Sequence, residues 1–267
     1  MAWLILVPAF LYLLVLLVLF SAQTALIFPV GQVAPAAALP ATAEPLEARA
    51  GSGERLRGIH IPPSRQGRER LLLLGFGGNA TDAATTAALL HDLFPEADVA
   101  AFHYRGYPPS EGRPGAAALQ ADALVVHDLL RARLRPARIV VAGFSVGGGI
   151  AASLAARRPV DGLILVTPFD SLAAVAAGHY RWLPVRLLLR HRLEPAAELR
   201  ASRVPVAIVA GGADTLVPPA RTDALRRAIP HLVFDQTIPN AGHNDIYADP
   251  AFPAAMRDAF LAVTAAR

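Results

Sequence analysis

The pentapeptide Gly143-Phe144-Ser145-Val146-Gly147 stands between two segments of different character. The apolar run 137–142 before it is typical of a buried strand, and segment 148–158 after it is compatible with a helix. A strand that turns at once into a helix needs Gly143 and Gly147, because a Cβ atom would block the close approach of the two elements. The pattern therefore predicts an exposed Ser145 hydroxyl at the end of a sheet strand.

Two further residue types turn such a serine into a nucleophile. A serine hydroxyl is weakly reactive at neutral pH, so it needs a histidine to take its proton and a carboxylate to orient that histidine. Both follow Ser145 in the chain order expected for this chemistry, each after a predicted strand. Asp214 follows the β-rich run 204–210, and His243 follows the run 231–238. The sequence predicts a triad of Ser145, Asp214 and His243.

Each triad member also has an ordinary interpretation when taken alone. An aspartate after glycines is usually a turn former, and a histidine in a loop is usually a solvated or structural side chain. The conjunction of three suitable residue types in the required order favours catalysis. Asp170 is a competing acid because it follows another strand-like run, 162–167. Asp214 is the favoured acid of the two.

Acyl transfer also requires N–H donors for a developing oxyanion. In this arrangement one comes from the residue after the serine, here Val146, and one from a loop after an earlier strand. The apolar run 71–74 predicts a strand buried on both faces, and it leads into the glycine-rich loop 75–79. Gly78 lets the backbone approach a substrate, and the backbone of Asn79 is the predicted second donor.

Several motifs together show a family resemblance that runs from about residue 54 to the C-terminus. They are Gly78-Asn79, Tyr104-Arg105-Gly106-Tyr107, Ser110-Glu111-Gly112, Gly143 to Gly148, Pro168-Phe169, Asp214 with Val217-Pro218, and Gly242-His243-Asn244-Asp245. With these motifs the chain resembles the α/β-hydrolases of the BEM46 type. The resemblance implies a serine hydrolase with the triad named above and an oxyanion donor at Asn79. Family members commonly carry His-Gly-Asn-Ala-Gly-Asn where this chain has Gly-Gly-Asn-Ala-Thr-Asp at 77–82.

The same glycine-rich loop offers a rival interpretation. Gly75, Gly77 and Ala80 match the dinucleotide fingerprint G-x-G-x-x-A, and the next predicted strand, 99–104, ends at Arg105, as an NADP site would require. This interpretation leaves the serine turn and its partners unexplained, so the hydrolase is favoured and no cofactor is expected. The chain has no cysteine, and its histidines lack metal-ligand spacing, so no metal is expected either.

Strand-like and helix-like segments alternate through most of the chain. This alternation predicts one α/β domain over 54–267, with a mostly parallel sheet covered by helices on both faces. The predicted strands are 54–61, 69–75, 98–104, 137–143, 160–167, 204–210 and 232–238, and the predicted helices are 81–94, 116–134, 148–158, 219–229 and 253–265. A pause over about 170–203 predicts a short cap.

The cap contains a stretch, 179–191, that mixes apolar residues with arginines. Such a stretch suits a lid that faces an acyl chain or a membrane surface. A helix packed on the core with its arginines in water is the favoured interpretation. An esterase active on lipid-like substrates fits either arrangement.

The N-terminus carries an uncharged apolar run, 2–20, of about the 20 residues that cross a bilayer. It predicts a membrane anchor over 1–29, followed by an Ala/Pro-rich, loosely structured linker over 30–53. A cleaved signal peptide, with small residues at 34–38 as its cleavage site, is the alternative.

The basic residues point to a bacterial source and argue against nucleic-acid binding. All 25 basic residues are arginines, which together with abundant alanine suggests a GC-rich bacterial genome. These arginines are scattered among acids, so no nucleic-acid partner is expected. The predicted location is the inner membrane, with a single-pass anchor and the catalytic domain outside the cytoplasm.

The expected function is a membrane-anchored serine hydrolase that cleaves a small-molecule or lipid-like carboxylic ester. Thioesters and amides share this chemistry. The alternative is a catalytically silent scaffold of the same fold that binds a lipid or a protein partner at the membrane.

Overall fold

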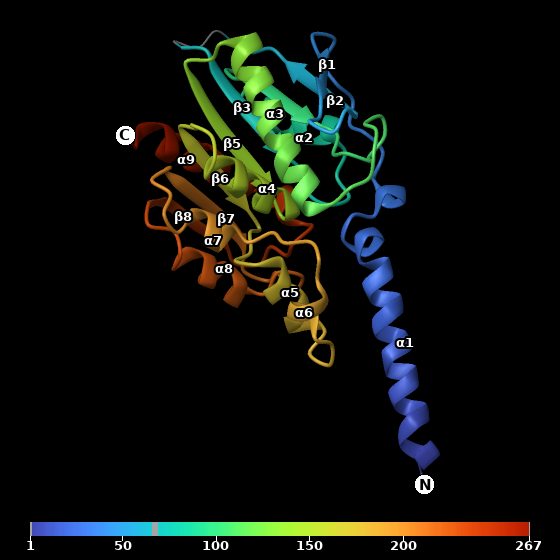
Figure 1. Cartoon of the computed structure of the whole chain (residues 1–267). Helices are drawn as coiled ribbons and strands as arrows, with labels where there is room; N and C mark the ends of the chain where they lie inside the picture. Colours follow the sequence, from blue (N-terminus) through green and yellow to red (C-terminus); the bar gives the residue numbers. More distant parts are fainter. Residues whose placement is uncertain (1, 66–68, 267) are drawn as a thin grey trace.

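The computed structural model describes residues 2–65 and 69–266, and its centre is an eight-stranded sheet (Figure 1). The strand order is β1-β2-β4-β3-β5-β6-β7-β8; β3 to β8 run parallel, and β2 is antiparallel to both of its neighbours. The strands are β1 (Glu44–Arg49), β2 (Arg55–Ile61), β3 (Leu71–Phe76), β4 (Asp98–Phe102), β5 (Arg138–Phe144), β6 (Gly162–Val166), β7 (Val206–Gly211) and β8 (Leu232–Ile238). The predicted α/β class and mostly parallel sheet are confirmed.

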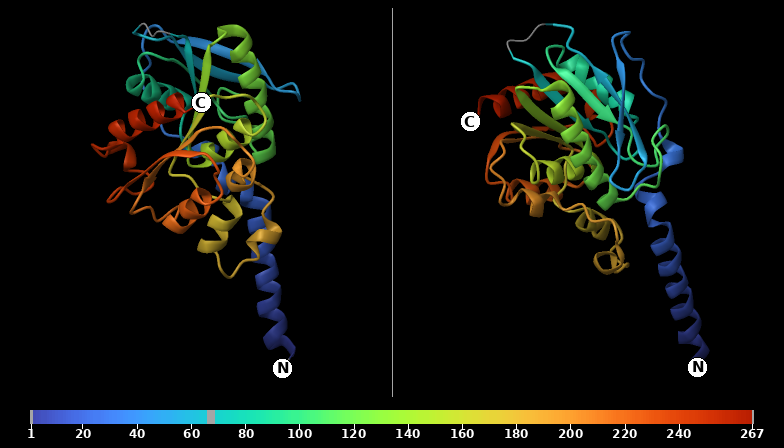
Figure 2. Two further views of the ribbon diagram at one scale, coloured as in Figure 1. Left: turned by 90° about the vertical axis from the view of Figure 1, so that its left-hand side faces the viewer. Right: turned by 45° about the horizontal axis from the view of Figure 1, so that its top comes forward.

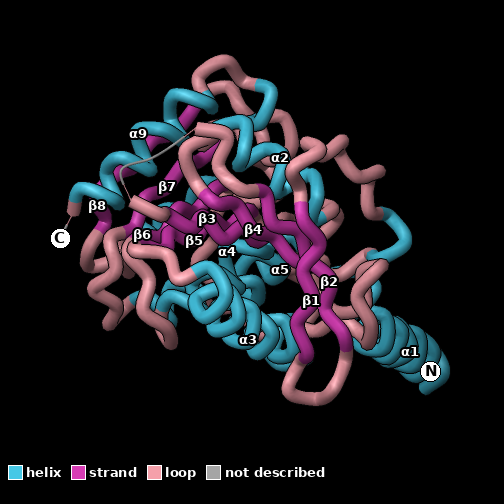
Figure 3. The backbone as a smooth tube through the Cα atoms, turned by 90° about the horizontal axis from the view of Figure 1, so that it is seen from above, coloured by secondary structure: helices cyan, strands magenta, loops and turns pink. Residues whose placement is uncertain are grey.

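Helices cover both faces of the sheet, with α2 and α9 on one side and α3 and α4 on the other (Figure 3). Successive strand residues point to opposite faces, so Leu72 and Leu74 pack with α3 and α4, whereas Leu73 packs with α2 and α9. The helices are α1 (Ala2–Ile27), α2 (Ala83–Leu93), α3 (Ala116–Leu134), α4 (Val146–Ala155), α5 (Leu172–His179), α6 (Val185–Leu188), α7 (Pro195–Leu199), α8 (Pro219–Arg226) and α9 (Phe252–Ala265).

The predicted loose linker is wrong for residues 44–49, which form β1. Leu46 and Ala48 are buried, while the other residues of the strand are exposed, and the strand pairs antiparallel with β2 at the edge of the sheet. Pro45 and the charged residues hid this alternation in the sequence. Both are tolerated there because one side of an edge strand is unpaired. On that side the missing N–H of proline costs no ladder hydrogen bond, and charged side chains reach water.

Helix α1 projects from the body of the molecule (Figure 2). It is the one helix among the described residues that is long and apolar enough to cross a membrane, with a mean hydropathy of 2.8. Such a helix near the N-terminus fits a single-pass anchor or a signal sequence. Directly after α1, Phe28 is buried in the core of the domain, so the end of the helix is fixed to the domain.

Candidate active site

Ser145 lies in the sharp turn between β5 and α4. Its backbone has φ of 51° and ψ of −118°, a strained conformation for a residue with a side chain. The Ser145 N–H donates to the carbonyl of Val166 at 2.9 Å, which fixes the turn against β6. A Cβ atom on Gly143 would lie 2.7 Å from the Ala151 methyl carbon. The sharp turn therefore depends on the absence of a side chain at 143.

A second glycine allows the turn to approach the end of β3. A Cβ atom on Gly147 would lie 2.1 Å from the carbonyl oxygen of Phe76 and 2.5 Å from that of Gly77. Both contacts are with backbone atoms, which a rotamer change cannot relieve.

We expect Gly147→Ala to destabilise the protein and to reduce hydrolysis. The backbone clash should lower the free energy of unfolding by about 1–3 kcal/mol, and an ångström-scale displacement of Ser145 should reduce turnover by about 10²-fold. Thermal unfolding and ester hydrolysis measure the two effects. Gly148→Ala is the control, because a Cβ there meets nothing closer than Leu165 at 3.6 Å. Equal stability and turnover in the two variants would contradict this account of the turn.

His243 and Asp214 meet Ser145 at the carboxyl ends of the parallel strands. The Nε2 atom of His243 lies 2.9 Å from Ser145 Oγ, and its Nδ1 atom lies 2.7 Å from Asp214 Oδ2. Asp214 Oδ1 accepts the backbone N–H groups of Leu216 and Val217 at 2.9 and 2.7 Å. An ionised carboxylate only accepts hydrogen bonds, so it holds the imidazole proton on Nδ1 and leaves Nε2 as the acceptor for the Ser145 proton.

Asp170, the competing acid, is paired elsewhere. Its Oδ2 atom accepts a hydrogen bond from Arg221 Nη1 at 3.2 Å. Burial raises the pKa of the Asp170 carboxyl, although the nearby Arg221 charge opposes this effect. The structure brings Asp214, and not Asp170, to His243.

The Gly77–Asn79 loop lies directly beside the serine turn. A Cβ atom on Gly78 would lie 4.0 Å from Ser145 Cβ. The Gly78 carbonyl accepts the N–H of Thr81 at 3.3 Å. The N–H of Asn79 belongs to the same planar trans peptide group as this carbonyl, so it points in the opposite direction. Within the described part of the chain, the N–H groups of Asn79 and Val146 have no acceptor. They are therefore available to a substrate oxygen.

Two buried tyrosines hold this loop in place. The Tyr104 hydroxyl donates to the carbonyl of Gly77 at 2.6 Å, and the Tyr107 hydroxyl donates to the carbonyl of Asn79 at 2.7 Å. Burial raises the pKa of both phenols, so they stay protonated as donors at neutral pH. Sequence reasoning assigned these tyrosines no individual role, although they flank Arg105 in one of the motifs that carry the family resemblance.

Arg105, the residue behind the NADP interpretation, is committed to acidic neighbours. Its Nε atom donates to Asp122 at 2.9 Å, and its Nη1 atom lies 3.0 Å from Glu54. The guanidinium thus binds two carboxylates and also donates to the Ser52 hydroxyl at 2.7 Å. In residues 2–65 and 69–266, no group of three or more metal-binding side chains is arranged to hold an ion.

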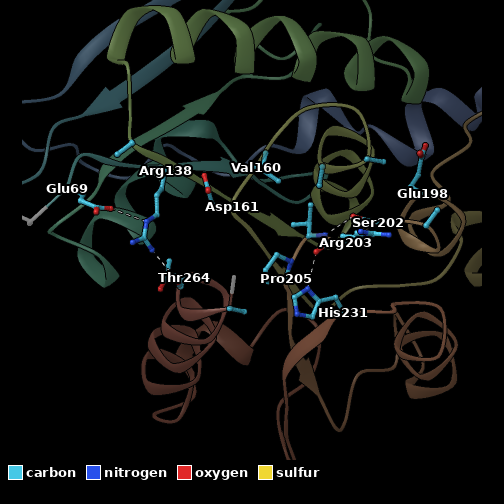
Figure 4. A pocket seen from close by; sticks show the side chains of 16 residues that line it. Glu69, Arg138, Val160, Asp161, Glu198, Ser202, Arg203, Pro205, His231 and Thr264 are labelled. Carbon is cyan, nitrogen blue, oxygen red and sulfur yellow. Dashed lines mark hydrogen bonds and ion pairs between the residues drawn. The ribbon is translucent and has the colours of Figure 1, made fainter.

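A cavity of about 860 Å³ lies at the amino ends of the parallel strands, and Figure 4 shows its lining. Its lining includes Asp161, Pro205 and His231, which precede β6, β7 and β8. Arg138 and Glu69 form an ion pair there at 3.1 Å. Ligands of parallel α/β sheets bind at the carboxyl ends of the strands, where Ser145, Asp214 and His243 lie, so this cavity is separate from the candidate site.

Sequence comparison connects the chain to hydrolases. A family model described as the alpha/beta hydrolase fold matches residues 71–188. An uncharacterized protein of Mycobacterium tuberculosis is 36% identical over 197 residues, which cover 72% of this chain and 69% of the relative. The lysophosphatidylserine lipase ABHD12 of Danio rerio is 30% identical over 138 residues, covering 45% of this chain and 36% of the lipase.

Solved structures share the fold. A Pyrococcus furiosus esterase superposes with a TM-score of 0.67 at 16% identity, covering 85% of this chain and 95% of the esterase. An alpha-beta hydrolase from Vibrio vulnificus superposes with a TM-score of 0.66 at 20% identity, covering 84% of this chain and 81% of that protein. At these identities the likeness establishes the architecture alone.

Proposed function

The chain belongs to the α/β-hydrolase superfamily, and on this premise we propose that it is a serine hydrolase that cleaves carboxylic esters through Ser145, His243 and Asp214. The observation that carries the proposal is the continuous hydrogen-bonded series from Asp214 through His243 to Ser145, with distances of 2.7 and 2.9 Å. A buried carboxylate, an oriented imidazole and a strained serine in contact are the parts that acyl transfer requires.

The mechanism follows from this geometry. His243 Nε2 takes the hydroxyl proton as Ser145 Oγ attacks the ester carbonyl carbon, and the backbone N–H groups of Asn79 and Val146 stabilise the oxyanion. Each such donor is worth about 3 kcal/mol in the transition state. The imidazolium, held by Asp214, then returns the proton to the departing alkoxide, which leaves as an alcohol. Water, deprotonated by His243, releases the acid from the acyl-enzyme and restores the serine.

The proposed substrate class is lipid-like esters. Support comes from the relative named a lysophosphatidylserine lipase, of which the matched region spans 36%, and from the apolar helix α1 attached to the domain. Assignment to the BEM46 type remains a prediction from the motifs. Thioesters and amides react by the same steps and compete as substrates.

The proposed location is a bacterial inner membrane, with α1 as a single-pass anchor and the catalytic domain outside the cytoplasm. The helix has 26 residues, and the hydrocarbon core of a bilayer requires about 20. The orientation rests on analogy with N-terminal signal anchors. In this proposal residues 1–29 form the anchor, the linker shortens to about 30–43 because of β1, and the cap of about 170–203 belongs to the hydrolase domain.

One labelling experiment tests both activity and orientation. Intact and lysed spheroplasts that contain the full chain are treated with a membrane-impermeant fluorophosphonate, and the modified peptide is identified by mass spectrometry. We expect label on Ser145 in both samples. Label only after lysis would reverse the orientation and leave the activity standing. A folded protein that stays unlabelled in both would refute the hydrolase and favour a silent scaffold that binds a lipid or a protein partner.

A further inference from the structure

One face of the C-terminal half of α1 is turned toward the cap segment that contains α5 and α6. Along α1, Leu16, Leu19, Gln23 and Ile27 are partly or fully buried and recur every three or four residues, which places them on one side of the helix. Figures 1 and 2 show α1 projecting from the body of the molecule on the same side as α5 and α6. This side of α1 therefore faces the cap and is partly buried, and its other sides are exposed.

Polar contacts fix α1 to the cap. The Tyr12 hydroxyl donates to the carbonyl of Trp182 at 2.8 Å. The Gln23 side chain accepts the backbone N–H of Arg190 at 2.7 Å and donates to the carbonyl of Leu188 at 3.4 Å. These hydrogen bonds fix the position of α1 relative to the cap, and a space remains between α1 and the cap.

That space is an apolar cavity of about 360 Å³. Half of its lining comes from α1 and half from the cap: Leu16, Leu19, Phe20, Gln23, Leu26, Ile27, Ala176, Tyr180, Leu183, Val185, Leu188 and Leu189. The Gln23 amide is already hydrogen-bonded, so the lining offers an occupant little besides hydrocarbon and the Tyr180 ring. Its volume falls within the roughly 300–1,000 Å³ typical of small-molecule sites.

Both sides of the cavity connect to the candidate active site. On one side, the carbonyl of Ile27 accepts a hydrogen bond from the Asn79 side chain at 3.2 Å, next to the proposed oxyanion donor. On the other side, His179 at the end of α5 contacts the carbonyl of Leu216 at 2.8 Å, and the Leu216 N–H binds Asp214. These hydrogen bonds link the segments on the two sides of the cavity to the loops that carry Asn79 and Asp214.

With α1 as the proposed anchor, the outer end of the cavity lies at membrane depth. Helix α1 is about 39 Å long at 1.5 Å per residue, and a bilayer core of about 30 Å takes up roughly its first 20 residues. Leu16 and Leu19 then lie within the near leaflet, while Ile27 lies above it. Trp182 and Leu187 at the tip of the cap are exposed, with 57% and 81% of their surface accessible, and apolar residues of this kind suit contact with lipid.

Exposed arginines on the cap suit the same membrane surface. They are Arg181, Arg186, Arg190 and Arg192. The Arg190 guanidinium lies 4.7 Å from the centre of the Phe20 ring on α1, so this charge is next to the proposed anchor. Arginines at the level of the headgroups attract anionic lipids, and their aliphatic stems tolerate apolar surroundings.

We propose that the cavity between α1 and α5–α6 holds the acyl chain of a long-chain lipid ester that enters sideways from the near leaflet. The chain would extend from the bilayer along the last twelve residues of α1 and place its ester at Ser145. The anchor is then one side of the substrate site as well as a tether. This inference rests on the proposed hydrolase function and specifies its substrate as a long-chain ester drawn from the membrane.

The test compares the hydrolysis of p-nitrophenyl hexadecanoate and p-nitrophenyl acetate by the full chain in lipid nanodiscs. Ala176→Phe fills the cavity from α5, and we expect it to lower the long-chain to short-chain ratio of kcat/KM by about ten-fold or more. Displacing two buried methylenes already changes affinity by about that factor. Gly178→Phe is the matched control on the same helix, because a Cβ there meets nothing within 4 Å, and it should keep the wild-type ratio.

Leu19→Trp fills the same cavity from α1 and should also lower the ratio of kcat/KM values. This second variant keeps the test decisive if the Ala176→Phe protein does not fold. If the wild-type enzyme hydrolyses both esters and neither filling variant changes the ratio, the acyl site is refuted and the proposed hydrolase function stands. Hydrolysis of neither ester by the wild-type protein would refute the proposed function and the acyl site with it.

Discussion

Replacing Ser145 with alanine is expected to lower kcat for ester hydrolysis by about 10⁴- to 10⁶-fold. The variant removes the proposed nucleophilic atom, Ser145 Oγ, while the proposed oxyanion donors at Asn79 and Val146 remain and would account for the residual rate. The folded structure should survive, because Ser145 Oγ makes its hydrogen bond to His243 and fills no part of the core.

Initial rates with a chromogenic ester, measured beside thermal unfolding curves, separate loss of chemistry from loss of structure. Ser64→Ala is the control, because this exposed serine lies in the loop after β2, at the opposite end of the sheet strands from Ser145. Retention of more than about a tenth of wild-type turnover by a folded Ser145→Ala protein would show that another group is the nucleophile.

Asp214→Asn should lower kcat at neutral pH by about 10⁴-fold. The amide keeps the shape of the carboxylate, but its NH₂ group can donate to His243 Nδ1, and this favours the tautomer with its proton on Nε2. That tautomer cannot accept the proton of Ser145. Asp214 is nearly fully buried, so the variant also removes the charge that stabilises the imidazolium formed during the reaction.

Asp170→Asn provides the matched comparison, since both carboxylates follow neighbouring parallel strands. Asp170 contacts Arg221 and not His243, so we expect turnover within about three-fold of wild type. Steady-state kinetics of the two variants decide the assignment. A reversed outcome, with Asp170→Asn inactive and Asp214→Asn active, would identify Asp170 as the acid.

The order of strands and helices was predictable because it depends on local patterns. Buried parallel strands read as apolar runs, such as 71–74, and glycines that permit close backbone contact stand at 143 and 147. The residues that meet at Ser145 could be named because the carboxyl ends of parallel strands converge at one edge of a sheet. β1 was missed because an edge strand buries few side chains and admits Pro45 and charges, which weakens its apolar signal.

By itself, the sequence determined the fold class, the set of residues gathered at the candidate site and the presence of one long apolar helix, since each depends on residue types at short spacings. Only the tertiary structure decided which acid reaches His243, how Tyr104 and Tyr107 hold the loop beside Ser145, and that α1 and the cap together line an apolar cavity. These features join segments up to 170 residues apart. No local sequence pattern indicates such pairings, because they arise when the sheet and its helices pack together and bring distant loops into contact.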